Sequence, residues 1–179
     1  MLRFLIALTC VLSMANSADS VTVVELKDGA LTAPTAQPKL VLSEAEWRKR
    51  LAPEVFAVLR SSGTERPFCG GLLTNKKPGY YVCGGCGLPL FAAAAKFESG
   101  TGWPSFNREV YKGNVERITD NSHGMERVEI RCARCGGHLG HVFNDGPAPT
   151  GERHCLNSAA LTFVADAPKA DHPGEAPAK

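Results

Sequence analysis

The chain lacks a strong net charge and has no long run of charge of one sign. Its 20 lysine and arginine residues nearly balance 18 aspartate and glutamate residues, for a formal net charge of +2. Binding to nucleic acid calls for a strong positive field, which this composition does not supply. We therefore expect no nucleic-acid partner, and other partners have to be inferred from individual sites.

The N-terminus lacks an apolar run long enough to span a membrane. The run at residues 4–12 covers about 9 residues, whereas a transmembrane helix needs roughly 20. Arg3 precedes this run and small residues follow it at 15–18, which is the order typical of an export signal. Residues 1–18 are predicted to be a signal peptide, with a buried N-terminal helix as the alternative and no stable membrane anchor after cleavage.

The remaining chain suits one domain between two segments without regular structure. Residues 19–40 carry small, polar and proline residues without helical or strand period, which indicates a linker. No bulky apolar residue follows Val164, so residues 165–179 are predicted to be a disordered tail. The domain is expected over residues 41–164.

Within this domain, two short helices are expected to precede a body of strands. Ser43 and Glu46 have the spacing of a capping box, and Pro53 suits the start of a second helix that ends near Gly63. The segments "GYYVC", "ERVEIRC", "HLGHVF" and "HCLNSAALTFV" are rich in aromatic or β-branched residues, and turn sequences separate them. The sequence therefore predicts a mainly β fold of the α+β class with antiparallel strands.

Four of the cysteines form two pairs with the spacing of a metal site. Six cysteines remain after Cys10 is removed with the signal, and an even number in an exported protein also fits three disulfides. However, "CGGCGLPL" and "CARCGGHLG" each present Cys-x-x-Cys followed by glycine, which favours one tetrahedral zinc. Four thiolates close the coordination shell, so this zinc would be structural; a redox motif remains the third alternative. The predicted ligands are Cys83, Cys86, Cys132 and Cys135.

Cys155 is the candidate nucleophile. If "RHCLN" is a strand, then Arg153, Cys155 and Asn157 share one face. A neighbouring guanidinium lowers the pKa of a thiol and favours the reactive thiolate. The alternative is that Cys155 is a small buried apolar residue.

Two further segments support a catalytic site. "GGHLGHVFNDG" contains His138 and His141, and "SGTGWPSF" holds Trp103 in a loop braced by glycine and proline. Each residue taken alone is more often structural. Together with a thiol and an arginine, however, they are the groups that a cysteine enzyme acting on a small apolar substrate requires.

The ordered motifs "RPFCGGLL", "CGGCGLPLF", "SGTGWPSF" and "SHGMERVEIRCARCGGHLGHVFNDGPAPTGERHCLNSAAL" resemble those of methionine-R-sulfoxide reductases of the B type. The resemblance runs from about Ser43 to Phe163. It implies two antiparallel sheets with short N-terminal helices, clipped together by the four-cysteine zinc site.

The resemblance also implies a mechanism and a set of roles. Cys155 would attack the sulfoxide sulfur, release methionine and become a sulfenic acid. His141 and His138 would supply a proton, while Trp103 and Phe143 would contact the substrate. The supporting roles fall to Asn157, which would orient a polar group, to Arg153, which would stabilise the thiolate, and to Asp145, which would pair with Arg153 or a histidine.

The sequence departs from the commonest family pattern at Thr101 and His154. Many members carry a resolving cysteine where this chain has Thr101, so Cys69 is the expected resolving thiol. Many carry a tyrosine or phenylalanine where this chain has His154. The expected partners are oxidised proteins or free methionine sulfoxide as substrate and a thioredoxin-like reductant.

The location follows from the predicted signal. An exported chain would act in a bacterial periplasm, or alternatively in a secretory lumen, outside the cell or in an organelle, and we expect it to be a monomer. The alternative function is a non-catalytic zinc-stabilised binding module, which would not need Cys155, His141 and Asn157 together.

Overall fold

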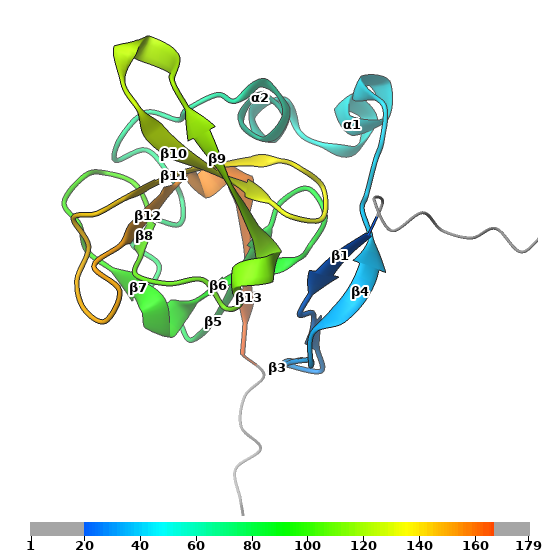
Figure 1. Ribbon diagram of the computed structural model, residues 1–179, viewed down its shortest axis with the longest axis horizontal. Coiled ribbons are helices and arrows are strands. Elements are labelled where there is room, and N and C mark those ends of the chain that lie inside the picture. The colour runs from blue at the N-terminus through cyan, green and yellow to red at the C-terminus, as the bar shows by residue number, and fades with distance from the viewer. Residues whose placement is uncertain (1–19, 167–179) are drawn as a thin grey trace, which may run out of the picture.

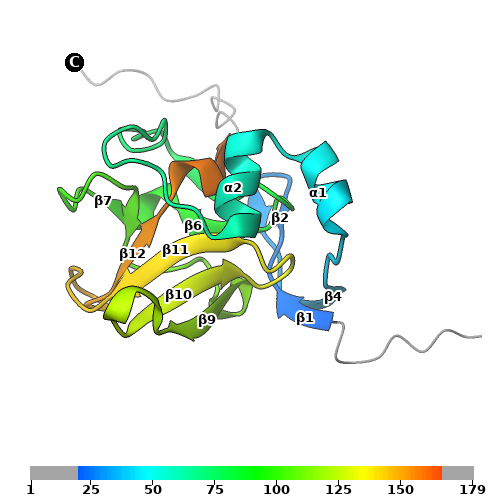
Figure 2. The ribbon, with the colours of Figure 1, turned by 90° about the horizontal axis from the view of Figure 1, so that it is seen from above.

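The protein is described by a computed structural model that places residues 20–166 (Figure 1). The predicted signal peptide and residues 167–179 of the predicted tail lie outside the described residues. Within residues 20–166, no helix is long and apolar enough to cross a membrane. Antiparallel sheets form the body, and Figure 2 shows helix α2 lying along strand β11 of the larger sheet.

The two short helices occupy the positions that the sequence predicts. Helix α1 (Glu44–Arg50) follows Ser43, whose hydroxyl accepts a hydrogen bond from the Glu46 N–H, while the Glu46 carboxylate accepts one from the Ser43 N–H. The predicted capping box is therefore confirmed. Helix α2 (Pro53–Ser61) begins with the proline, as expected. Both helices bury apolar side chains against the sheets, namely Trp47, Phe56, Val58 and Leu59.

Six strands form the larger antiparallel sheet, in the order β7-β8-β12-β11-β10-β9. These strands are β7 (Lys96–Phe97), β8 (Ser105–Phe106), β9 (Val115–Asp120), β10 (Arg127–Cys132), β11 (His138–Phe143) and β12 (Arg153–Leu156). The register pairs Cys155 with His141 on one side and with Ser105 on the other. Cys155 therefore lies on an interior strand whose backbone is held from both sides.

Three strands form the smaller sheet, in the order β13-β5-β6. They are β5 (Gly79–Cys83), β6 (Pro89–Ala92) and β13 (Leu161–Ala165). Between β12 and β13 the chain passes from one sheet to the other through the 3₁₀ helix η5 (Ser158–Ala160), so the predicted strand segment at 154–164 is broken at its centre. The other 3₁₀ helices are η2 (Ala93–Ala95), η3 (Lys112–Asn114) and η4 (Ser122–Gly124).

Residues 20–38 correct the linker prediction. Strand β1 (Ser20–Val23) pairs with β4 (Thr35–Pro38), and β2 (Leu26–Lys27) pairs with β3 (Ala30–Leu31). The side chain of Asn114 accepts a hydrogen bond from the Val24 N–H at 3.0 Å and donates one to the Val24 carbonyl at 2.9 Å. These strands are too short to show a period, and a buried amide 90 residues away holds them, so local sequence could not reveal them.

The core fills the space between the two sheets. The Phe106 ring lies 4.9 Å from that of Tyr81 and 4.7 Å from that of Phe91, measured between centroids. Leu156 and His154 of β12 are buried on this side of the strand. Strand β13 extends to Ala165, and the Asp166 N–H donates to the Pro78 carbonyl, so the ordered chain runs slightly beyond the predicted domain end.

Candidate active site

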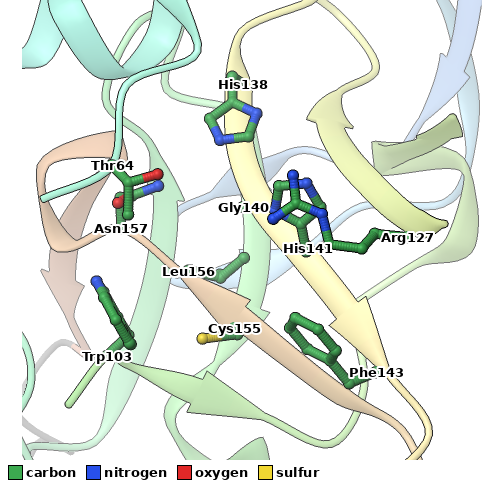
Figure 3. A pocket seen from close by; sticks show the side chains of 10 residues that line it. All are labelled: Thr64, Trp103, Arg127, His138, Gly140, His141, Phe143, Cys155, Leu156 and Asn157. Carbon is green, nitrogen blue, oxygen red and sulfur yellow. The ribbon is translucent and has the colours of Figure 1, made fainter. Parts of the chain in front are cut away.

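Cys155 lies at the wall of a cavity of about 150 Å³. Figure 3 shows its thiol pointing toward Trp103, with two histidines and Phe143 along the neighbouring strand β11. Because His141 pairs with Cys155 in the register, the strand spacing places the imidazole beside the thiol. The cavity is lined by Thr64, Trp103, Arg127, His138, Gly140, His141, Phe143, Cys155, Leu156 and Asn157.

Arg153 sits next to the thiol and is itself held on two sides. Its guanidinium donates to both oxygens of Asp145, at 2.9 and 3.0 Å, and lies 4.5 Å from the centroid of the Phe143 ring. Asp145 is therefore the partner of Arg153, one of the two alternatives predicted for it. These contacts hold the Arg153 guanidinium and the Phe143 ring in place relative to each other.

The expectation of a lowered pKa for Cys155 needs correction. Burial of the thiol is the largest influence and raises its pKa, while Arg153 and a hydrogen bond with Thr101 act in the opposite direction. Burial prevails, so the pKa lies above the ordinary cysteine value. Cys155 therefore keeps its proton near neutral pH when no substrate is present.

His138 is buried and paired with Glu129. Its Nδ1 lies 2.6 Å from the Glu129 carboxylate, which also accepts a hydrogen bond from Arg131 at 2.7 Å. Burial acts to raise the pKa of Glu129, but the hydrogen bonds from Arg131 and His138 outweigh it and lower that pKa. The ionised carboxylate can only accept, so the Nδ1 of His138 carries a hydrogen.

His141 is held in the same way by Asp120. The His141 Nε2 lies 2.9 Å from Asp120 Oδ2, and Arg127 donates to that oxygen at 2.6 Å. Hydrogen bonds from Ser122, His141 and Arg127 hold the pKa of Asp120 well below its usual range, so the Nε2 of His141 carries a hydrogen. Burial lowers the pKa of His141, partly countered by Asp120, which leaves the other ring nitrogen free to take up and release a proton.

Asn157 and Trp103 are positioned through Glu65. The Asn157 side chain accepts from the Glu65 N–H at 3.0 Å and donates to the Leu139 carbonyl at 3.2 Å, and no hydrogen bond to a histidine is found in the described chain. The Trp103 indole donates to the Glu65 carbonyl at 3.1 Å. The Asn157 side chain is therefore held by backbone groups of two segments that border the cavity.

Cys69 is exposed and is not bonded to Cys155 in this structure. The preceding residue, Phe68, donates its backbone N–H to the Gly102 carbonyl at 2.8 Å. Gly102 follows Thr101, the residue that hydrogen-bonds to the Cys155 thiol. The loop that carries Cys69 therefore packs directly on the segment that contacts the nucleophile.

The four cysteines of the two Cys-x-x-Cys pairs converge away from this cavity. Their sulfurs all lie within 4.8 Å of one another, with Cys83–Cys135 at 3.6 Å and Cys86–Cys132 at 3.5 Å. Tetrahedral zinc with bonds of about 2.3 Å separates its sulfur ligands by roughly 3.8 Å, so this set fits the ion. The bonded distance of a disulfide, about 2 Å, does not occur between them.

The comparisons with known proteins agree with this geometry. The SelR domain family matches residues 51–165. The chain is 56% identical over 121 residues to the peptide methionine sulfoxide reductase MsrB of Leptospira interrogans, covering 68% of this chain and 92% of that protein. The MsrB proteins of Methanosarcina mazei and Bradyrhizobium diazoefficiens are each 54% identical, over 72% and 71% of this chain and 92% and 91% of their own lengths. The chain belongs to the B-type methionine-R-sulfoxide reductases.

In this family member, the structure gathers most of the predicted site residues around one cavity. Arg153 lies behind Phe143, and Cys69 lies in an adjoining loop. The predicted site did not include the cavity residues Thr64 and Arg127 or the partners that orient the histidines. Alternation in "ERVEIRC" places Arg127, Glu129 and Arg131 on one face of the strand. This pattern was a signal for Arg127, which lines the cavity, and for Glu129, which pairs with His138.

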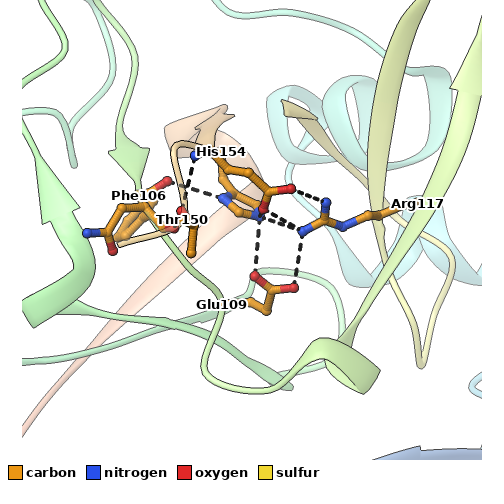
Figure 4. A network of polar contacts seen from close by, with 7 residues as sticks. Phe106, Glu109, Arg117, Thr150 and His154 are labelled. Carbon is orange, nitrogen blue, oxygen red and sulfur yellow. Dashed lines mark hydrogen bonds and ion pairs between the residues drawn. The ribbon is translucent and has the colours of Figure 1, made fainter. Parts of the chain in front are cut away.

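A second group of charged side chains surrounds His154 (Figure 4), whose side chain lies on the opposite face of β12 from that of Cys155 because the two residues are consecutive in the strand. His154 is fully buried, and its Nε2 lies 3.3 Å from Glu109. Arg117 donates to Glu152 at 2.7 and 2.9 Å and to Glu109 at 3.3 Å. His154 contributes most to lowering the pKa of Glu109 to about 2. Arg117 and His154 both contact the two carboxylates, so this group forms an ion-pair and hydrogen-bond network beside β12.

Proposed function

We propose that the chain reduces methionine-R-sulfoxide to methionine with Cys155 as the nucleophile. Its sulfur attacks the sulfoxide, the S–O bond of the substrate breaks, and the oxygen remains on Cys155 as a sulfenic acid. The substrate sulfur gains two electrons and the cysteine sulfur loses two. The observation that carries this proposal is a lone thiol facing an indole and two carboxylate-held histidines in one small cavity.

The proton for the oxygen comes from the site itself. The raised pKa of Cys155 keeps a proton on the thiol, and this proton balances the reaction when it reaches the oxygen. His141 is the relay, because Asp120 fixes one ring nitrogen and leaves the other for proton transfer. His138, whose ring centroid lies 5.6 Å from that of His141, supports it from the neighbouring position.

The cavity walls select the substrate. Trp103 and Phe143 provide apolar surfaces for the methyl group of methionine sulfoxide. The Asn157 side chain accepts the Glu65 N–H hydrogen bond and so holds that edge of the cavity in place. Arg153 stabilises the thiolate as the proton leaves. The volume of about 150 Å³ suits the side chain, so the rest of a protein substrate would lie outside the cavity.

Cys69 is the proposed resolving thiol. Its sulfur displaces the hydroxyl group of the Cys155 sulfenic acid, which releases water and forms a Cys69–Cys155 disulfide. A thioredoxin-like dithiol then reduces this disulfide by exchange. Support comes from the contact between the Cys69 loop and the Thr101–Gly102 segment beside the nucleophile.

Cys83, Cys86, Cys132 and Cys135 are proposed to hold one structural zinc. Bound zinc would link the turns after β5 and β10, and its four thiolate ligands would leave no position for a reacting water. The N-terminal sequence supports export, and we propose the bacterial periplasm as the compartment.

Turnover of the separate sulfoxide epimers tests the proposal. With dithiothreitol as reductant, the R epimer should be reduced and the S epimer should react at least about a hundredfold more slowly, because only one configuration presents sulfur to Cys155 while oxygen faces His141. Equal rates on both epimers would contradict the proposed geometry. Absence of turnover on both would favour the non-catalytic binding module.

A further inference from the structure

Glu65 makes side-chain contacts that tie the loop before Cys69 to the segment after Cys155. Its carboxylate accepts hydrogen bonds from the Ser158 N–H at 2.6 Å and the Ala159 N–H at 3.1 Å. These N–H groups open the 3₁₀ helix η5, where the chain leaves the larger sheet. A carboxylate at such an end satisfies donors that the helix cannot pair itself.

The backbone of Glu65 contacts two cavity residues at the same time. Its N–H donates to the Asn157 side chain and its carbonyl accepts from the Trp103 indole, at 3.0 and 3.1 Å. Four hydrogen bonds therefore pass through one residue. They connect the Trp103 indole to the segment that follows Cys155. The residues of that segment, Asn157–Ala159, lie 92 to 94 positions after Glu65 in the sequence.

Gly70 brings the far end of the Cys69 loop to the same point. A Cβ atom on Gly70 would lie 2.1 Å from the Ser158 hydroxyl oxygen and 2.6 Å from a Glu65 carboxylate oxygen. The loop therefore starts at Glu65 and returns to Glu65 and Ser158. Cys69 lies between these two ends, on a short loop that is also held at Phe68 by the Gly102 carbonyl.

We propose that Glu65 is a positioning residue that fixes Trp103 relative to Cys155 and anchors the base of the Cys69 loop. It touches neither the thiol nor the substrate cavity with its side chain in the contacts described. The role rests on the proposed function, because Trp103 is taken as the substrate wall. Loss of the carboxylate releases the 64–66 segment and with it both backbone contacts.

Steady-state kinetics provide the first test. A displacement on the order of 1 Å can cost about a hundredfold in rate, so Glu65→Ala should lower kcat/KM for methionine-R-sulfoxide by about ten- to a hundredfold, mainly by raising KM. Glu65→Gln, which keeps one acceptor oxygen, should have a smaller effect of the same kind. Iodoacetamide should alkylate Cys155 at the wild-type rate, because β8 and β11 hold that residue. Glu54→Gln, an exposed glutamate in α2, is the matched control.

A spectroscopic test needs no activity. The chain contains two tryptophans, so incorporation of 5-fluorotryptophan gives two ¹⁹F resonances. The Trp103 resonance should shift or broaden in Glu65→Gln, while that of Trp47, the buried residue of α1, should stay unchanged and act as an internal control. If the wild type failed to reduce the sulfoxide, the proposed function would be wrong and this test would still decide the role of Glu65.

A double variant and a glycine variant decide the remaining cases. Trp103→Phe removes the donor to the Glu65 carbonyl, so adding Glu65→Gln to it should raise KM much less than in the wild type. Gly70→Ala should disturb the same junction from the opposite side and reproduce the Trp103 resonance change if Glu65→Ala does not fold. Additive effects on KM, or an unchanged Trp103 resonance in both Glu65→Gln and Gly70→Ala, would overturn the proposal.

Discussion

The four-cysteine cluster and the Cys155 site use the same side chain in opposite ways. In the cluster, each cysteine pair lies on a turn, and an equivalent backbone hydrogen bond closes both turns. The Gly87 N–H donates to the Cys83 carbonyl and the Gly136 N–H donates to the Cys132 carbonyl, both at 2.8 Å. The turns aim four sulfurs at one point. Cys155 instead lies within a strand, where the backbone is satisfied on both sides, and within residues 20–166 no disulfide joins its thiol to another cysteine.

This difference shows that the supporting backbone, more than the residue type, decides what a cysteine does. Four sulfurs gathered on paired turns are arranged as a set of metal ligands, and a metal bound there would become part of the fold. A single thiol on a rigid strand facing a cavity stays available for reaction. The following predictions test this contrast from the largest effect to the smallest.

Breaking the cluster should unfold the protein. Structural zinc contributes roughly 10 kcal/mol or more to folding in small domains, so Cys132→Ser should give insoluble protein or protein without a cooperative thermal transition. Circular dichroism and elemental analysis for zinc are the measurements. Cys69→Ser is the control and should keep one zinc per chain; a folded, metal-free Cys132→Ser protein would remove the contrast.

Replacing the strand thiol should have the opposite outcome. Cys155→Ser should keep the fold and the zinc, because β8 and β11 hold the backbone and a serine hydroxyl can still hydrogen-bond to Thr101, but it should lower sulfoxide reduction by about 10³-fold or more. Thermal denaturation and turnover with dithiothreitol measure the two effects. A large loss of stability in this variant would place Cys155 with the structural cysteines.

Cys69→Ser should separate the first chemical step from recycling. One methionine per enzyme should still form and a dimedone-reactive sulfenic acid should accumulate, while turnover with thioredoxin falls by about tenfold or more because no disulfide is offered to it. Rapid quench and mass spectrometry follow both products. Full thioredoxin-dependent turnover in Cys69→Ser would instead point to direct reduction of the sulfenic acid by an external thiol.

The smallest expected effect concerns the pH dependence of Cys155. In the Cys69→Ser background, alkylation should titrate with a pKa above that of a free cysteine, because burial disfavours the thiolate. Arg153 acts to lower this pKa, so Arg153→Met should move the titration to still higher pH and slow alkylation at pH 8. Arg108→Met removes an equal charge at an exposed position and should leave the curve unchanged.

The sequence was sufficient to predict most of the residues that gather at the cavity and all four cysteines of the cluster. Paired cysteines identified the candidate metal ligands, and period-two spacing placed Arg153 and Cys155 on one face of a strand. Cap signals at Ser43 and Pro53 located both helices. These features depend on residues close together in the chain, where spacing alone fixes geometry.

The groups that hold the chemistry in place could not be predicted in the same way. Glu65 acts on residues more than 90 positions away, and Asp120 reaches His141 across the intervening strand β10. The β1–β4 strands depend on Asn114. The sign of the Cys155 pKa shift also required the structure, because burial and the Arg153 charge oppose each other and only packing decides between them.

The long sequence separation within the cysteine cluster sets an order of events during synthesis. Cys86 and Cys132 are 46 positions apart, so at typical synthesis rates the first pair precedes the second by roughly 2–10 s. During that interval the thiols of Cys83 and Cys86 are present in the chain, but the other two cysteines of the cluster are not. Cys155 is made after all four, so the proposed nucleophile enters the chain only when every cysteine of the cluster already exists.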